Sequence, residues 1–210
     1  MLRFINKVIG CVMEFDTAKT LFGVGLIVAL VGGFTSFVDM GAVGLLGLVL
    51  TLIGAYGLSE HYGRRDIFNN MLIATIIAFV GGVVVVLLIL GSLVGIAITS
   101  PGALPDIWSI LGVLIAVWLG LWVLVIVSTY FERKAFIALY EASGSDNFKK
   151  AADFVWWGAL LFVILVGLVL FLVGAIFAII GAFELKPPRK ESGYYTTSQQ
   201  PPPPAPSSAV

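Results

Sequence analysis

The chain has 210 residues, of which 60% are hydrophobic and 11% are charged, and its mean hydropathy is +1.07. Soluble domains average about 45–50% apolar and about 25% charged residues, so this composition excludes a single soluble globule and makes the lipid bilayer the solvent of the chain. The formal net charge of zero gives no positive field to attract nucleic acid, and the single Cys11 and single His61 exclude disulfide frameworks and paired-histidine metal motifs.

Residues 1–16 are predicted to form an amphipathic segment that lies in the membrane interface. Leu2, Ile5 and Ile9 recur at helical spacing, while Arg3 and Lys7 take other faces. A frayed terminus is the alternative interpretation.

Long apolar runs then alternate with short polar connections, which predicts an all-α, polytopic transmembrane bundle over residues 17–185. Five spans are expected, at residues 20–38, 42–58, 70–98, 107–130 and 154–183. The third apolar run is longer than the hydrocarbon core of about 30 Å requires, so its helix is expected to tilt or protrude. The fourth helix is expected to continue beyond the membrane to residue 141. Residues 186–210 are rich in proline and predict a disordered tail.

The side of the membrane that holds this tail depends on the last apolar run. Basic residues precede the first span, and by the positive-inside rule the N-terminus is cytoplasmic in a multi-pass protein of the cell membrane. A single span over 154–183 places the tail outside. A hairpin there adds a sixth span and places all 12 Lys and Arg residues inside.

Two patterns in the last run oppose each other. Residues 174–183 are similar to residues 47–56, and a repeat would make both segments run inward, as six spans require. A hairpin, however, needs a turn within 161–170, which has no polar residue, and unpaired backbone in lipid costs several kcal/mol per group. The seven-residue spacing of Gly167, Gly174 and Gly181 also fits one continuous helix. We therefore favour five spans, with six as the alternative.

Small residues spaced by four occur in every predicted span, although chance spacing is an alternative for any one row among 24 glycines. Apolar side chains gain little by leaving lipid, so close approach of backbones must supply helix association. The predicted packing residues are Gly25, Ala29, Gly33, Gly47, Ala78, Gly82, Gly91, Gly95, Gly112, Ala116, Gly120, Gly167, Gly174, Ala178 and Gly181.

Other side chains have both a functional and an ordinary interpretation. Trp118 and Trp122, four residues apart, could line a groove for lipid or quinone, but ordinary packing is favoured. Six basic residues could contact anionic headgroups, while their simpler role is to fix orientation; they are Arg64, Arg65, Arg133, Lys134, Lys149 and Lys150.

The chemistry of coupled transport and catalysis is missing from the pattern. No ionisable residue falls within a predicted span, which argues against ion coupling. Hydroxyls at Thr35, Ser36, Thr51, Thr75 and Ser92 could line a pore for neutral solutes, although bonding to their own helices is favoured. His61 lies near Glu60 and Asp66 in sequence, yet no nucleophile accompanies them. We expect no catalytic, cofactor or metal site.

Several segments carry a family resemblance: Leu58-Ser-Glu-His-Tyr-Gly-Arg-Arg-Asp-Ile-Phe-Asn-Asn70, Phe131-Glu-Arg-Lys-Ala-Phe136, Phe148-Lys-Lys-Ala151 and Ile180-Gly-Ala-Phe183. Over roughly residues 20–185 the chain resembles a prokaryotic, largely archaeal, membrane family called domain of unknown function 996. The resemblance implies a polytopic membrane protein and brings no established activity, cofactor or catalytic residue. The proline-rich tail departs from the family pattern.

The sequence favours a non-enzymatic protein that packs with copies of itself or with other membrane-protein subunits in the bilayer. A channel or facilitator for small neutral or hydrophobic solutes is the first alternative. A lipid-modifying enzyme that uses the segments 59–70 or 130–153 is the second.

Overall fold

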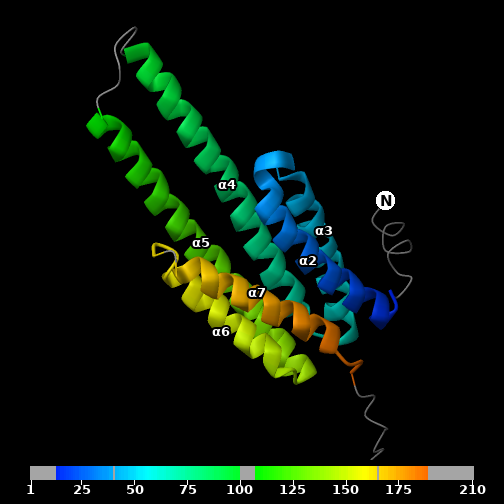
Figure 1. Ribbon diagram of the computed structural model, residues 1–210. Helices are drawn as coiled ribbons and strands as arrows, with labels where there is room; N and C mark the ends of the chain where they lie inside the picture. The colour runs from blue at the N-terminus through cyan, green and yellow to red at the C-terminus, as the bar shows by residue number, and fades with distance from the viewer. Residues whose placement is uncertain (1–12, 40, 100–106, 165, 189–210) are drawn as a thin grey trace, which may run out of the picture.

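A computed structural model describes residues 13–39, 41–99, 107–164 and 166–188, and within these ranges the chain is helical with no strand. The helices are α2 (Phe15–Asp39), α3 (Ala42–His61), α4 (Arg65–Thr99), α5 (Ile107–Ser143), α6 (Asp146–Leu160) and α7 (Val166–Glu184). They form three antiparallel hairpins, α2/α3, α4/α5 and α6/α7 (Figure 1). The predicted all-α fold is confirmed. Most of the predicted N-terminal segment and of the predicted tail lies outside the described residues.

Five of these helices are long and apolar enough to cross a membrane, as predicted. Their spanning stretches are Phe15–Thr35, Ala42–His61, Arg65–Ser92, Ile110–Ser143 and Val166–Glu184. α4 and α5 have 35 and 37 residues, which corresponds to about 52–56 Å of helix. They extend well past the α2/α3 hairpin (Figure 1). The chain is therefore a multi-pass membrane protein whose central hairpin is longer than a bilayer core.

The prediction of one continuous helix over 154–183 is wrong. α6 ends at Leu160 and α7 begins at Val166, so the chain reverses direction inside the apolar run. The expected cost of unpaired backbone is largely avoided, because the amide of Leu161 donates to the Trp157 carbonyl and the amide of Ile164 donates to the Leu161 carbonyl. Backbone hydrogen bonds of the kind found in helices therefore stabilise the turn without any polar side chain.

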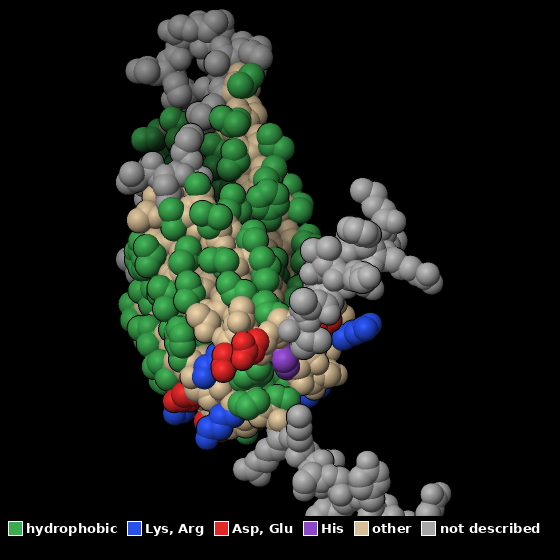
Figure 2. Space-filling view, turned by 90° about the vertical axis from the view of Figure 1, so that its right-hand side faces the viewer, with side chains coloured by type: hydrophobic (Ala, Val, Ile, Leu, Met, Phe, Trp, Pro, Cys, Tyr) green, Lys and Arg blue, Asp and Glu red, His purple; other side chains and the backbone are tan. Residues whose placement is uncertain are grey.

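This turn brings the end of α7 back to the start of α2. The Lys19 ammonium donates to the carbonyl of Leu185 at 3.0 Å, and the Tyr62 hydroxyl donates to the carbonyl of Lys186 at 2.6 Å. Leu185 and Lys186 therefore lie at the end of the bundle that carries the α3–α4 connection, as the six-pass alternative requires. Figure 2 shows charged side chains gathered at this end, which we call the charged end, below a hydrophobic body.

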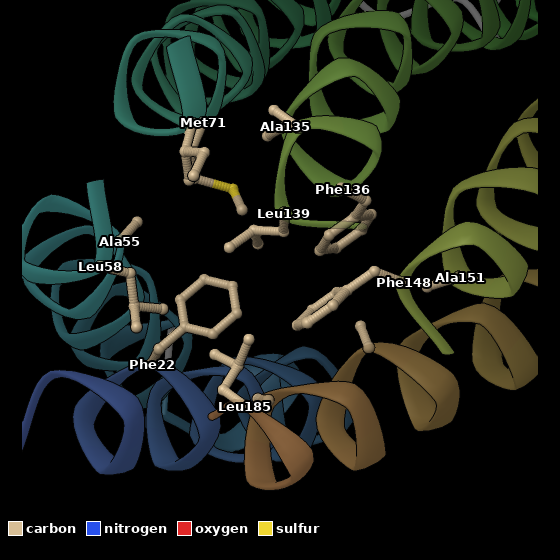
Figure 3. Close-up of a cluster of buried hydrophobic side chains, with 14 of the residues drawn as sticks. Phe22, Ala55, Leu58, Met71, Ala135, Phe136, Leu139, Phe148, Ala151 and Leu185 are labelled. Carbon is tan, nitrogen blue, oxygen red and sulfur yellow. The ribbon is translucent and has the colours of Figure 1, made fainter. Parts of the chain in front are cut away.

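The buried core also lies at the charged end. Phe22, Phe136 and Phe148 are fully buried, and the Phe148 ring lies 6.4 Å from that of Phe22 and 6.2 Å from that of Phe136 (Figure 3). The outer parts of α4 and α5 instead expose large apolar side chains. The hydrophobic effect requires contact with water, so it can stabilise the core at the charged end. The parts of the helices that lie in lipid must instead rely on close packing.

The α2/α3 and α6/α7 hairpins repeat one packing pattern, listed here pair by pair. Phe22 packs on Gly54 as Phe148 packs on Gly181; Ala29 packs on Gly47 as Val155 packs on Gly174; Gly32 packs on Gly44 as Gly158 packs on Phe171. Each α2 residue and its counterpart in α6 are separated by the same number of positions in all three comparisons, and the same holds for α3 and α7. α3 and α7 both run toward the charged end, as the similarity between 47–56 and 174–183 predicts for a repeat.

Candidate functional site

The seam between α2 and α3 contains three of the predicted packing residues. A Cβ on Gly25 would lie 2.6 Å from the Thr51 Oγ1 atom, and one on Gly47 would collide with the backbone of Ala29. Only glycine at these positions allows the two backbones this approach. Sequence reasoning missed Gly32, Gly44 and Gly54 in the same seam. Contact residues along each helix are separated alternately by three and four positions, whereas the predicted rows keep a spacing of four.

The seam between α6 and α7 uses the heptad glycines of α7. A Cβ on Gly174 would lie 2.6 Å from Val155 Cγ2, and one on Gly181 would lie 3.3 Å from the Phe148 ring. Gly167 packs on the backbone of the turn, and Ala178 is buried. The seven-residue spacing thus marks a hairpin interface rather than a continuous helix.

The predicted packing residues of α4 and α5 behave differently. A Cβ built on Gly82, Gly91, Gly112 or Gly120 meets no other atom within 4 Å, and the same holds for Gly33 of α2. Ala78 and Ala116 are exposed, and Gly95 lies farther along α4. The contact that sequence reasoning missed is Gly81, which packs against Leu124 of α5.

The open small residues near the α2/α3 hairpin line an apolar groove of about 550 Å³. Its lining residues are Ala29, Gly33, Gly41, Gly44, Leu45 and Leu48 from the α2/α3 hairpin, with Ala78, Phe79, Gly82, Val83, Val86 and Leu87 from α4. Cavities of this size accommodate ligands or side chains of a partner.

In the repeat, the position that corresponds to the exposed Gly33 is Ala159, which is fully buried. Helix α5 covers it there: the Trp122 indole donates to the Ala159 carbonyl at 3.2 Å, and the Trp118 ring stacks on Phe162 at 5.8 Å. Trp118 and Trp122 therefore pack against the α6/α7 turn. The groove is the uncovered counterpart of a face that α5 covers in the second hairpin.

At the charged end, His61, Glu60 and Asp66 each bond to a different partner and do not form an acid–base site. The His61 Nε2 atom bonds the Met13 carbonyl at 2.6 Å, Glu60 accepts from the Tyr56 hydroxyl, and Asp66 pairs with Arg64. Within the described residues, no group of three His, Cys, Asp or Glu side chains could hold a metal ion.

Ion pairs and hydrogen bonds connect the helices at this end. Arg64 pairs with Asp66 at 2.6 Å and with Glu141 of α5 at 2.9 Å, and the hydrogen bonds to these two carboxylates raise the pKa of its guanidinium. Burial raises the pKa of the Tyr62 hydroxyl to about 12. Asn147 donates to Glu184 at 2.6 Å, which joins the start of α6 to the end of α7.

The other predicted headgroup residues lie around α5 and α6. Arg133 pairs with Asp153 at 3.4 Å, and the ammonium groups of Lys134, Lys149 and Lys150 lie over aromatic rings. Arg65 is exposed at the start of α4.

Three of the candidate pore hydroxyls bond closely to their own helices, and the side chain of Ser36 lies outside the described part of the chain. Thr51 donates to the Gly47 carbonyl, Thr75 to the Met71 carbonyl and Ser92 to the Leu88 carbonyl, each four residues back. Hydroxyls used in this way are not presented to a passing solute.

A family model described as "Protein of unknown function (DUF996)" matches residues 43–176. The matched range runs from the start of α3 to the middle of α7. No curated protein and no solved structure matches the chain.

Proposed function

The chain belongs to the DUF996 family of proteins of unknown function, and on this premise we propose that it is a non-enzymatic membrane protein that associates with other transmembrane helices. The partner is a second copy of the chain or another subunit of a membrane complex. The cell membrane is the proposed location, with the charged end and the N-terminus in the cytoplasm, because the described basic residues gather at that end.

The groove between the α2/α3 hairpin and α4 carries this proposal. Its wall has glycine or alanine at Ala29, Gly33, Gly44, Ala78 and Gly82, so a helix could approach the backbone closely. The equivalent face of the α6/α7 hairpin is covered by a helix that brings two tryptophans. A transmembrane helix with a bulky side chain is the occupant that this comparison supports.

The test is a pair of leucine substitutions on α4. Gly82→Leu fills the groove, whereas Gly91→Leu adds the same side chain to the same helix outside it; neither Cβ meets an atom within 4 Å. Both variants are therefore expected to fold.

The protein is extracted from its native membrane in a mild detergent, and the mass and composition of the particle are measured. We expect a stoichiometric partner or a homo-oligomer with the wild type and with Gly91→Leu, and its loss with Gly82→Leu. A wild-type protein that is monomeric and alone would overturn the proposal.

A further inference from the structure

Both α5 and α6 change from apolar to charged at one level, and aromatic and basic side chains gather there. The apolar part of α5 ends at Thr129, and the rings of Tyr130 and Trp156 lie 6.3 Å apart across the seam between the two helices. The Lys134 ammonium lies 4.5 Å from the centre of the Tyr130 ring, and the Arg133 guanidinium lies 5.6 Å from that of Trp156. Tyrosine and tryptophan at such a transition mark the level of the lipid headgroups.

The two cations of this cluster retain unused binding capacity. Lys134 is exposed and forms no ion pair within the described residues, which contain three ion pairs in all. Arg133 has one ion pair, to Asp153 at the long distance of 3.4 Å, and its buried Nε atom has no hydrogen-bond partner there. The buried Nε atom is out of reach of an added acceptor, but the partly exposed guanidinium also has terminal N–H donors and the Lys134 ammonium has three, so donors remain for an acceptor that arrives from outside.

We propose that this seam binds the headgroup of an anionic phospholipid, with Lys134 and Arg133 as the phosphate-binding cations and Tyr130 and Trp156 as the rings that hold them at the bilayer surface. Phosphate oxygens are strong acceptors for both cations. Arg64 shows the contrast, because its guanidinium is already occupied by two carboxylates from its own chain.

The lipid rather than free phosphate is the source of the ligand. The cluster lies directly beside the lipid-exposed surface of α5, where Val127 and Tyr130 are exposed. A headgroup arrives there with its acyl chains already in contact with that surface. Charge complementarity with anionic lipid contributes about fivefold in binding for each basic residue near the surface, which corresponds to about 1 kcal/mol.

The experiment measures quenching of tryptophan fluorescence in phosphatidylcholine vesicles that contain a small fraction of brominated phosphatidylglycerol. The difference between wild type and Trp156→Phe isolates the signal of Trp156. We expect stronger quenching by brominated phosphatidylglycerol than by brominated phosphatidylcholine. Lys134→Gln should weaken this preference about fivefold, and Lys134→Arg should restore it. Inorganic phosphate at a concentration matched to the lipid should not compete.

Lys186→Gln is the matched control, because it removes one exposed cation from the same end but outside the cluster. It should leave the quenching of Trp156 unchanged. Equal quenching of the wild type by the two brominated lipids would overturn the proposal. An equal effect of Lys134→Gln and Lys186→Gln on the quenching would also overturn it, because the lipid preference would then depend on overall surface charge and not on the cluster. Competition by inorganic phosphate would assign the cluster to a soluble anion instead.

Discussion

Replacing Phe148 with alanine tests where the fold keeps its stability. Phe148 is fully buried at the charged end and lies against Phe22, Phe136 and Gly181. Truncating a buried phenylalanine costs about 3–5 kcal/mol, and each aromatic pair adds about 0.5–1.5 kcal/mol beyond burial. We expect a loss of about 4–5 kcal/mol in the free energy of unfolding, because the aromatic pairs put Phe148 in the upper half of the truncation range.

The control is Phe34→Ala on α2, whose side chain is 63% exposed. Lipid contacts this ring in the folded protein, so its loss should change the free energy of unfolding by less than about 0.5 kcal/mol. Both values come from titration with a denaturing detergent in mixed micelles, with helicity as the readout. Equal losses of unfolding free energy for the two variants would refute the inference that the hydrophobic effect stabilises the charged end while helix packing stabilises the parts in lipid.

Three further predictions concern single contacts. Trp122→Phe removes the donor to the Ala159 carbonyl and should destabilise the α6/α7 turn by about 1 kcal/mol, seen as faster proteolysis or hydrogen exchange there. Gly174→Leu, whose Cβ would lie 2.6 Å from Val155 Cγ2, should lower the denaturation midpoint strongly; an unchanged midpoint would contradict the α6/α7 seam. The pKa of Tyr62 is raised by burial from 10.0 to about 12, so its stabilising contribution is complete below pH 10 and is lost as pH rises through 12; Tyr62→Phe should flatten the alkaline part of the stability profile.

The apolar spans could be predicted from sequence because length and composition decide them. The runs that became α2, α3, α4 and α5 have polar connections, and each connection marks where a helix ends. The seven-residue spacing of the glycines in α7 was also visible. What the spacing does not encode is the direction of the neighbouring chain, so the same pattern fitted both a continuous helix and a hairpin.

The similarity between residues 47–56 and 174–183 indicated a reversal, but the position of the turn after Leu160 could not be predicted because its stabilising contacts are distant in sequence or belong to the backbone. The segment from Leu161 to Ile164 has no glycine, proline or polar residue. Its reversal is held by backbone bonds and by α5, through the Trp122 donor and the Trp118 ring. Such long-range support leaves no local signal.

Spacing also does not distinguish a closed seam from an open one. Gly174 and Gly120 both stand in rows of small residues four apart. Gly174 packs against α6, whereas a Cβ on Gly120 would meet open space. The difference depends on which helices the connections bring together. The headgroup residues show the same limit, because sequence alone could not distinguish Arg64, which forms two ion pairs, from Lys134, which lies over the Tyr130 ring and forms no ion pair within the described residues.

The chain turns back within 161–164 and returns the end of α7 to the charged end, and thiol labelling tests this topology directly. Single cysteines are introduced in a Cys11→Ser background at Arg65 and at Lys186, two exposed positions of that end. An impermeant thiol reagent is applied to sealed vesicles of known orientation. Both cysteines should react from the same side of the membrane. Reaction of the two from opposite sides would contradict this topology and would restore a continuous helix over residues 154–183.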